Sequence, residues 1–116
     1  MNTTIYGIPN CDSVKKARRW LDGKDIDYRF HDFRSDGLDA SQLRNWLAQL
    51  GWETLVNRRS SSWKALDPAL RDSMDDERAE RCILDTPTLI KRPLLVRDGT
   101  IEVGFTPERY AELFGA

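Results

Sequence analysis

The sequence predicts an α/β fold in which one four-stranded mixed sheet is interrupted by an all-helical insert. Two observations support this prediction. Short segments rich in β-branched and aromatic residues lie near both ends of the chain, and a central block of roughly fifty residues shows only helix and turn signals. The chain has 116 residues, the size of one domain. We therefore expect a single domain over residues 1–116, with the helical insert at about 38–86.

The first third of the chain predicts a strand, a helix and a second strand. Residues 3–8 are β-branched and aromatic, and the turn-forming Pro9 follows them. Apolar residues then recur at helical spacing over 12–22, and Gly23 stands where a C-cap belongs. Residues 26–33 alternate between apolar and polar, as a strand with one buried face does.

The middle of the chain has helical periodicity. Asp39 or Ser41 can cap a helix that Gly51 ends. Pro68 suits the first turn of a later helix, and acidic residues open the last helix of the block. Four shorter segments are expected after Gly51, at 52–56, 62–66, 67–71 and 75–84.

The last quarter predicts a hairpin and a closing helix. Asp98-Gly99 separates two apolar runs, 93–96 and 100–104, which is a strong hairpin signal, and Pro107 opens a helix to Phe114. The crossover helix makes the first strand pair parallel, and the tight turn makes the last pair antiparallel. The resulting order, β-α-β, helical insert, β-β-α, is that of the thioredoxin-like fold.

Charge and cysteine content narrow the function classes. Lys plus Arg number 18 and Asp plus Glu 19, so no net field attracts nucleic acid or an anionic membrane. The sequence has neither an apolar run of about 20 residues nor a signal-peptide pattern. Two cysteines do not make a disulfide framework. We expect a cytoplasmic protein with reduced thiols, and no direct nucleic-acid or membrane partner.

Cys11 is the candidate nucleophile. It lies at the junction between the first strand and the first helix, where free backbone amides and the helix dipole stabilise a thiolate. Such positions lower cysteine pKa values, and Lys15, one turn later, adds a cation, whereas Asp12 opposes the effect. The alternative is a small buried apolar residue at a strand end.

The predicted site holds one thiol. In a Cys-x-x-Cys motif the resolving cysteine would stand at position 14, where this chain has Val14, so turnover needs an external thiol. Cys82 lies on the apolar side of a predicted helix beside Ile83, which favours a packing role over a resolving one. His31 at a strand end is given no role, and no Cys/His spacing indicates a metal site.

Two further segments could bind an anion or a peptide backbone. Pro93 begins the third strand; a cis Arg92-Pro93 bond would turn the backbone of Arg92 outward beside Cys11, where an extended thiol tripeptide could pair with it, although trans bonds are commoner. Arg58 and Arg59 lie in a loop of small polar residues, which is either solvated or a fork for a carboxylate or oxyanion.

The sequence resembles the family of glutaredoxin-linked arsenate reductases and Spx-like proteins, and within it an uncharacterised branch of suspected glutathione-dependent thiol reductases. The resemblance covers nearly the whole chain, and its motifs are residues 6–17 (YGIPNCDSVKKA), 57–59 (NRR), 89–93 (LIKRP) and 103–105 (VGF). It implies a thioredoxin-like fold with a helical insert and Cys11 as the nucleophile. It also implies that Arg59 and Arg92, the latter before a cis Pro93, bind an anion. Together with Asn10 and Lys15 on either side of Cys11, these residues form the expected substrate or anion site.

Two positions depart from the arsenate reductases. Phe105 and its neighbours replace a third arginine before the last helix, and Gly7 replaces a histidine in the first strand. A missing cation weakens oxyanion stabilisation, by roughly 2–4 kcal/mol by analogy with a lost oxyanion donor. We therefore expect a thiol-disulfide oxidoreductase or arsenate-reductase-like enzyme, with no bound cofactor or metal.

Under this hypothesis glutathione is the co-substrate and resolving thiol, with glutaredoxin as a further partner, and the substrate is a small oxyanion, thiol or disulfide. The alternative function is an Spx-like regulator that binds RNA polymerase. A third hypothesis is a protein that keeps the fold and has neither activity.

Overall fold

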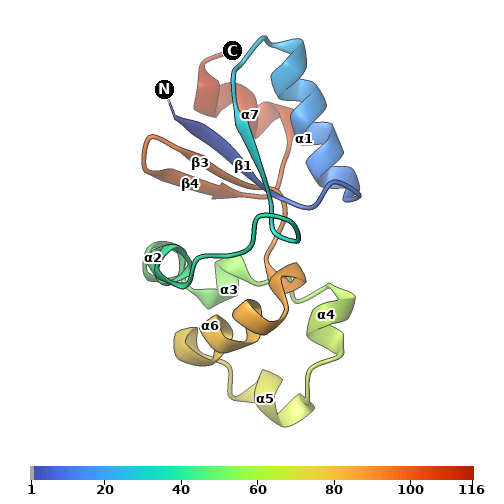
Figure 1. Cartoon of the computed structure of the whole chain (residues 1–116), viewed down its shortest axis with the longest axis vertical. Coiled ribbons are helices and arrows are strands. Elements are labelled where there is room, and N and C mark those ends of the chain that lie inside the picture. Colours follow the sequence, from blue (N-terminus) through green and yellow to red (C-terminus); the bar gives the residue numbers. More distant parts are fainter. Residues whose placement is uncertain (1) are drawn as a thin grey trace. The chain divides into compact units, whose positions relative to one another are not determined.

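A computed structural model describes residues 2–116; Met1 lies outside the described residues. The chain divides into two compact units (Figure 1). The sheet unit comprises the residues up to Gly37 and those from Arg92 to the end, and the helical unit comprises Leu38–Lys91. Each unit is described by itself below.

The sheet unit contains four strands in the order β2-β1-β3-β4. β1 is parallel to β2 and antiparallel to β3, and β3 is antiparallel to β4. Helix α1 connects β1 to β2, and helix α7 follows β4. This mixed sheet and its element order confirm the predicted thioredoxin-like fold. The bounds are β1 Thr3–Gly7, α1 Asp12–Gly23, β2 Arg29–Asp32, β3 Leu94–Arg97, β4 Thr100–Val103 and α7 Pro107–Phe114.

One face of the sheet is covered by α1 and α7 together (Figure 1). Ile5 of β1 pairs with Leu95 of β3, so both side chains point to the same face, where they pack with residues of the two helices. Every member of this core is at most 2% exposed: Ile5, Ala17, Leu21, Leu95 and Tyr110. Burial of these side chains fixes α1, and with it the start of α1, against the sheet.

The second strand is shorter than the sequence predicts. β2 begins at Arg29, whereas alternation suggested a start at residue 26. The chain leaving α1 is still bound to that helix, because the Ile26 N–H donates to the Leu21 carbonyl and Asp25 adopts a positive φ of 54°. Ile26 packs on the core without pairing in the sheet. The third strand likewise begins one residue late, at Leu94, since Pro93 has no N–H to donate.

The helical unit consists of short helices joined by tight turns. Asp39 caps the first of them by accepting from the Ser41 N–H, and Gly51 ends it with a φ of 79°. The bounds are α2 Ala40–Leu50, α3 Trp52–Leu55, α4 Ser61–Lys64, α5 Pro68–Asp72, α6 Asp76–Asp85 and the 3₁₀ turn η1 Pro87–Leu89, which the sequence did not predict.

In the helical unit a β-bridge joins the segment after α3 to the segment after η1. Val56 pairs antiparallel with Ile90, and on either side of this pair Asn57 donates to Leu89 and Lys91 donates to Leu55. These bonds extend the unit to Lys91. Among the described residues no helix combines the length and the apolar character that crossing a bilayer requires.

Candidate functional site

Cys11 is the N-cap residue of α1. It has the extended backbone of a cap (φ −95°, ψ 127°), and its carbonyl oxygen accepts from the Lys15 N–H at 2.9 Å. Its own N–H donates to the Ile8 carbonyl at 3.4 Å, which closes a turn through Pro9 and Asn10. The side chain is half-buried, and the sulfur caps no amide of the helix. The thiol therefore lies at the amide end of a twelve-residue helix and is reachable from solvent.

The sheet register brings further segments to the same end of the sheet as Cys11. Tyr6 of β1 pairs with Leu94, and Leu94 pairs with Val103 of β4, so the end of β1, the start of β3 and the end of β4 coincide. Just beyond them the Gly104 N–H donates to the Pro93 carbonyl at 2.9 Å. The Arg92-Pro93 peptide bond is cis, which the sequence had left open.

Arg92 carries a polar atom that lacks a partner. Its Nη1 is shielded from solvent, and no hydrogen-bond acceptor for it exists among residues 2–116. A guanidinium has five N–H donors and stays charged, so a shielded donor without an acceptor is costly. An anionic ligand would supply the missing acceptor. Arg92 therefore fits the anion-binding role that the sequence assigned to it.

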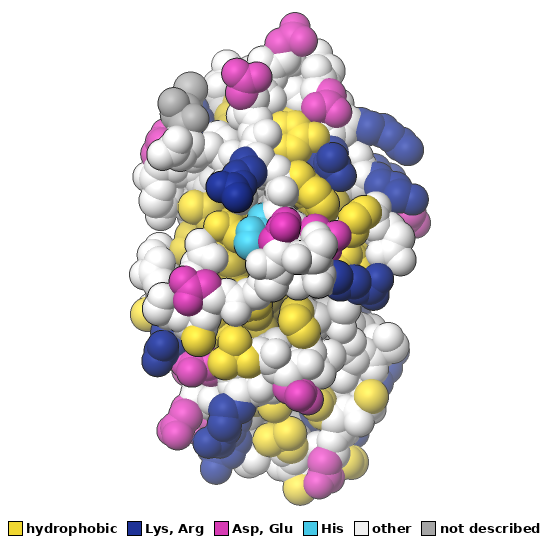
Figure 2. Space-filling model, viewed as in Figure 1, with side chains coloured by type: hydrophobic (Ala, Val, Ile, Leu, Met, Phe, Trp, Pro, Cys, Tyr) yellow, Lys and Arg dark blue, Asp and Glu magenta, His cyan; other side chains and the backbone are white. Residues whose placement is uncertain are grey.

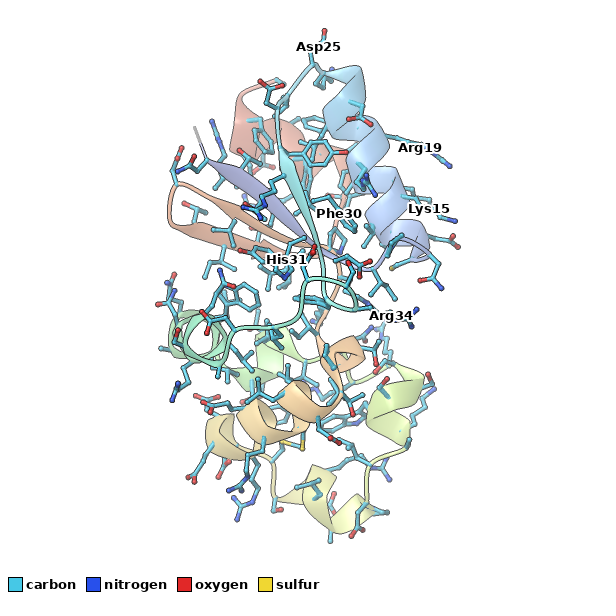
Figure 3. The ribbon with its side chains drawn as sticks, in the orientation of Figure 1. Lys15, Arg19, Asp25, Phe30, His31 and Arg34 are labelled. Carbon is cyan, nitrogen blue, oxygen red and sulfur yellow. The ribbon has the colours of Figure 1, made fainter. Side chains whose placement is uncertain are left out.

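Lys15 and Asn10 are exposed on either side of Cys11. Lys15 lies one turn into α1, and its side chain projects from the helix away from the sheet (Figure 3). No ion pair holds its ammonium group within the described part of the chain. Lys15 is thus free to meet an anion at the start of α1. No side-chain contact of Asn10 distinguishes it from an ordinary turn residue.

The two arginines of the insert differ in their surroundings. The guanidinium of Arg58 lies 5.4 Å from the ring centroid of Trp52, which stacks on Trp63 at 5.9 Å. Arg59 is exposed; its backbone N–H donates to Asn57 Oδ1 at 3.0 Å, and its guanidinium has no partner among the described residues. Arg58 is held by the protein, whereas Arg59 is available. Arg59 belongs to the helical unit, and Cys11 and Arg92 belong to the sheet unit.

His31 and Cys82, to which the sequence analysis gave no role in catalysis, have contacts or burial typical of structural residues. His31 Nε2 lies 2.7 Å from the Gly37 carbonyl oxygen, and its ring is 4.8 Å from that of Tyr6. Cys82 is half-buried on α6, and burial raises the pKa of its thiol. A raised pKa disfavours the reactive thiolate, which agrees with a packing role. Residues 2–116 contain no cluster of three or more potential metal ligands.

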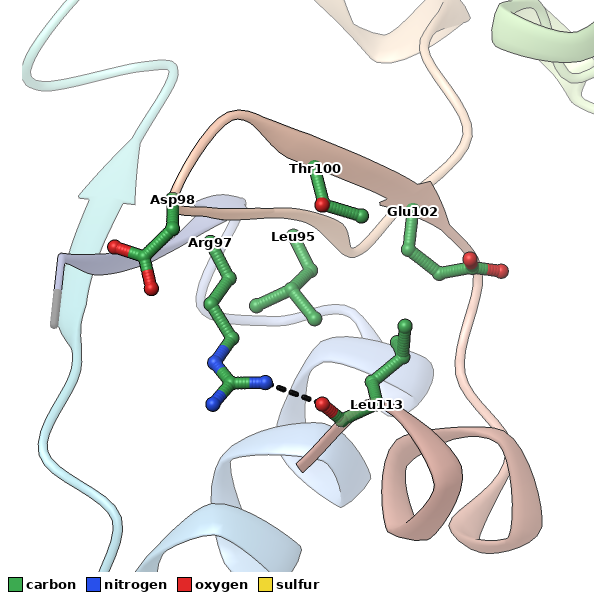
Figure 4. A pocket seen from close by; sticks show the side chains of 6 residues that line it. All are labelled: Leu95, Arg97, Asp98, Thr100, Glu102 and Leu113. Atoms are coloured by element: carbon green, nitrogen blue, oxygen red, sulfur yellow. Dashed lines mark hydrogen bonds between the residues drawn. The ribbon is translucent and has the colours of Figure 1, made fainter. Parts of the chain in front are cut away.

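A cavity of about 230 Å³ lies between the β3–β4 hairpin and the end of α7 (Figure 4). Arg97 crosses it, donating from Nη1 to the Leu113 carbonyl and placing its guanidinium 4.6 Å from the centroid of the Phe114 ring. A cation that binds a free carbonyl at a helix C-terminus stabilises that end of the helix. Arg97 therefore has a structural role, and neither Cys11 nor Arg92 lines this cavity.

A groove that the sequence did not predict lies beside α1. It is lined by Lys16, Arg19 and Trp20 and by residues 105–108 before and within α7. In the sequence Lys16 and Arg19 look like an ordinary solvated helix face. The sequence contains no local signal for the groove, because its two sides are more than eighty residues apart along the chain.

The fold and the site together define a class: a thioredoxin-like protein with one cysteine at the start of the first helix, near a cis-proline. A comparison with known protein families shows to which family the chain belongs. The model of the ArsC family matches residues 6–113, and the chain belongs to this family.

Relatives that match nearly the whole chain support the assignment. An uncharacterised protein of Haemophilus influenzae is 44% identical over 111 residues, covering 96% of this chain and 97% of the relative. The solution structure of an arsenate reductase (ArsC) related protein from Brucella melitensis is 44% identical, with a TM-score of 0.82 over 100% of this chain and 97% of that one. The global transcriptional regulator Spx of Listeria innocua is 28% identical, over 90% of this chain and 81% of the regulator. The chain is thus an arsenate-reductase-related protein.

Proposed function

We propose that this protein is a glutathione-dependent thiol-disulfide oxidoreductase in which Cys11 is the nucleophile. The observation that carries the proposal is the position of Cys11, half-buried at the amide end of α1, on the side of the sheet where the cis Arg92-Pro93 bond lies. Backbone amides at a helix start favour the thiolate form, and thiolate is the attacking species in disulfide exchange.

The reaction runs through a mixed disulfide on Cys11. The Cys11 thiolate attacks the glutathione sulfur of a substrate disulfide; one S–S bond forms, another breaks, and the substrate thiolate leaves and takes a proton from water. A free glutathione thiolate then attacks the glutathione sulfur bound to Cys11. This step releases oxidised glutathione and restores the Cys11 thiolate. One glutathione is consumed for each substrate thiol that is freed.

The cations serve to position anionic groups. Glutathione carries two carboxylates, and the shielded Nη1 of Arg92 offers a donor to one of them. Lys15, exposed one turn after Cys11, offers a second positive charge. Arg59 is assigned to the same task by the family resemblance, and its guanidinium is not used elsewhere in the described chain.

Reduction of an oxyanion such as arsenate is a less favoured activity of the same thiol. The resemblance expects a third arginine before the last helix, where this chain has Phe105. A phenyl ring supplies no charge to an oxyanion, and the loss of one such donor costs roughly 2–4 kcal/mol of transition-state stabilisation. In disulfide exchange the developing negative charge lies on sulfur and not on an oxyanion. This reaction therefore tolerates Phe105 in place of an arginine better than oxyanion reduction does.

Intact-protein mass spectrometry after treatment with oxidised glutathione tests the proposal. The wild type should gain one glutathione, Cys11→Ser should gain none, and Cys82→Ser should behave as the wild type. Added reduced glutathione should remove the adduct. Absence of an adduct on the wild type, or an equal adduct on Cys11→Ser, contradicts the proposal.

A second candidate function is an Spx-like regulator that binds RNA polymerase. Its support is the 28% identity to Spx over 90% of this chain. Val14 removes the Cys-x-x-Cys redox switch from such a regulator. Purification of tagged wild type and Cys11→Ser from cells separates the two functions: recovery of polymerase with both variants favours the regulator, and recovery with neither favours the enzyme.

A further inference from the structure

The groove beside α1 belongs entirely to the sheet unit and has a volume of about 600 Å³. Lys16, Arg19 and Trp20 of α1 form one side, and residues 105–108 form the other. Thr106 caps α7 by accepting from the Arg109 N–H at 3.2 Å, which fixes the course of the second side. The groove is therefore built from two well-anchored elements.

Aromatic rings form a firm apolar floor. Trp20 and Phe105 are both partly exposed, and both pack edge-on against the fully buried Tyr110, with ring centroids 5.7 Å and 4.7 Å apart. Tyr110 lies in the core between the sheet and the two helices. Such a pre-formed apolar surface can accept a large side chain without rearranging, as the anchor positions of protein interfaces do.

The rim on the α1 side is positive. Lys16 and Arg19 are exposed, and neither forms an ion pair within residues 2–116. Figure 2 shows Lys and Arg side chains gathered along the side of the sheet unit where α1 runs, and Figure 3 shows Lys15 and Arg19 projecting from that helix. Glu108, on the opposite side, is the one acid that lines the groove. The whole chain carries a net charge of −1, so the positive charge of this rim is a local feature.

The two cations of the rim lie on the helix that begins at the nucleophile. Lys16 and Arg19 follow Cys11 by five and eight residues, which places them about 7.5 Å and 12 Å along the axis of α1 at 1.5 Å per residue. A peptide segment lying in the groove would therefore reach the start of α1 within a few residues of extended chain.

We propose that this groove docks an acidic segment of a partner protein, one that places a large apolar side chain on Trp20 and Phe105 and carboxylates beside Lys16 and Arg19. The charge of the rim selects an acidic partner, since long-range attraction steers association and like charges repel. A segment of a protein fits better than a small molecule, because the residues of the rim are exposed and would leave much of a small ligand in water.

The docked partner is the protein whose disulfide Cys11 attacks, a statement that rests on the proposed function. Docking would bring a glutathionylated cysteine of the partner to Cys11 and raise the rate of exchange above that with free oxidised glutathione. The groove then selects which protein disulfides are reduced.

Binding is tested without any thiol chemistry. Amide chemical shifts of ¹⁵N-labelled Cys11→Ser are recorded against a cysteine-free peptide in which acidic residues flank one phenylalanine, and against the same peptide with lysines in place of the acids. We expect the acidic peptide to shift residues 16–20 and 105–108. The double variant Lys16→Glu/Arg19→Glu, made in the Cys11→Ser chain, should bind at least about fivefold more weakly.

The matched control, in the same chain, is Arg29→Glu/Lys64→Glu, which changes the net charge equally at exposed positions outside the groove and should bind as Cys11→Ser does. About 0.5 M NaCl should weaken binding of the acidic peptide to Cys11→Ser and to the control variant, in which the rim stays positive. Equal binding of the two peptides, shifts elsewhere, or no effect of the groove double variant overturns the proposal. A dimer that the groove variant abolishes in sedimentation would also overturn it, in favour of a second copy as occupant.

Whether docking in the groove serves the reaction of Cys11 is tested by the rates of thiol-disulfide exchange between Cys11 and glutathionylated peptides. With otherwise wild-type chains, a glutathionylated acidic peptide should react faster than its lysine counterpart. The Lys16→Glu/Arg19→Glu variant should reverse this order while its Cys11 reacts with the neutral reagent iodoacetamide at close to the wild-type rate. Peptide binding without any exchange at Cys11 overturns the proposed function and leaves the docking site standing. Exchange without preference between the peptides overturns the docking site and leaves the proposed function standing.

Discussion

Val14 packs on Gly7 so closely that a Cβ atom added to Gly7 would lie 2.7 Å from Cγ2 of Val14. Val14 is fully buried, and Gly7 is the last residue of β1. Position 14 is where a Cys-x-x-Cys motif would have its resolving cysteine, and position 7 is where the resemblance to arsenate reductases implies a histidine. The two residues form one packing arrangement, in which an isopropyl group fills the space that a side chain at position 7 would need.

Gly7→Ala should therefore destabilise the protein. Overpacking at a buried contact costs about 1–3 kcal/mol, and we expect a loss of that size in the free energy of unfolding measured by urea denaturation. Val14→Ala combined with Gly7→Ala should be less than additive, because the smaller residue relieves the contact. Gly23→Ala is the control, since a Cβ there meets nothing within 4 Å and α1 should gain stability. Equal effects of the two glycine substitutions would refute this account of Gly7.

Val14→Cys should change how the glutathione adduct on Cys11 is removed. A thiol three residues after Cys11 on the same helix turn can attack the adduct on Cys11, release glutathione and form an internal disulfide. Mass spectrometry after oxidised glutathione should then show the loss of two hydrogens in place of a stable adduct. A persistent adduct beside a free new thiol would show that position 14 cannot reach Cys11.

Arg92→Ala should slow the reaction of Cys11 with an anionic reagent more than with a neutral one. Under the proposed function, the shielded Nη1 of Arg92 binds an anionic group at this end of the sheet. We expect the alkylation rate of Cys11 with iodoacetate to fall roughly threefold to tenfold, and that with iodoacetamide to change little. Arg29→Ala, at an exposed position of β2, is the control. Equal slowing with both reagents argues against an anion-binding role.

Tyr110→Phe should leave stability at neutral pH unchanged or raise it slightly. The hydroxyl of Tyr110 is buried without a hydrogen-bond partner among the described residues, so its removal relieves a desolvated polar group. Tyr28→Phe is the contrasting substitution, because the Tyr28 hydroxyl accepts from Arg18 Nε at 3.2 Å and its loss should cost about 0.5–1.5 kcal/mol. Thermal or urea unfolding of both variants measures the difference.

The same tyrosine predicts a loss of stability at high pH. Burial, with a contribution from the charge of Glu102, raises the pKa of Tyr110 in the folded protein above its ordinary value of 10.0. The unfolded chain then releases the phenolic proton first, so the free energy of unfolding falls as pH rises above about 10. Tyr110→Phe should show a smaller fall over this range. If the free energy of unfolding of the wild type and of Tyr110→Phe depended on pH in the same way, Tyr110 would not be the cause of the fall.

Local sequence signals predicted those parts of the fold that depend on neighbours in the chain. The turn at Pro9, the helix from Asp12 and the hairpin at Asp98-Gly99 are set by capping and turn chemistry, and all three are observed. The position of Cys11 follows from them. Alternation alone predicted too early a start for β2, since residues 26–33 alternate in the sequence but Ile26 remains hydrogen-bonded to the end of α1.

Features that depend on distant segments could not be predicted. The bond from Gly104 to Pro93 arises only once β3 and β4 are aligned, and the shielding of Arg92 Nη1 has no signal in the sequence. The groove needs α1 beside the start of α7, and these meet through the buried Tyr110. The contact of the Arg58 guanidinium with the ring of Trp52 likewise has no signal in the sequence.

The central claim is that Cys11 is an activated thiol, and the protein contains its own reference in Cys82. Peptide mapping after brief exposure of the native wild type to iodoacetamide at about pH 7 gives both alkylation rates in one sample. Because Cys11 lies at the start of α1 and burial raises the pKa of Cys82, Cys11 should react at least about tenfold faster. Equal rates, or faster alkylation of Cys82, would contradict the account.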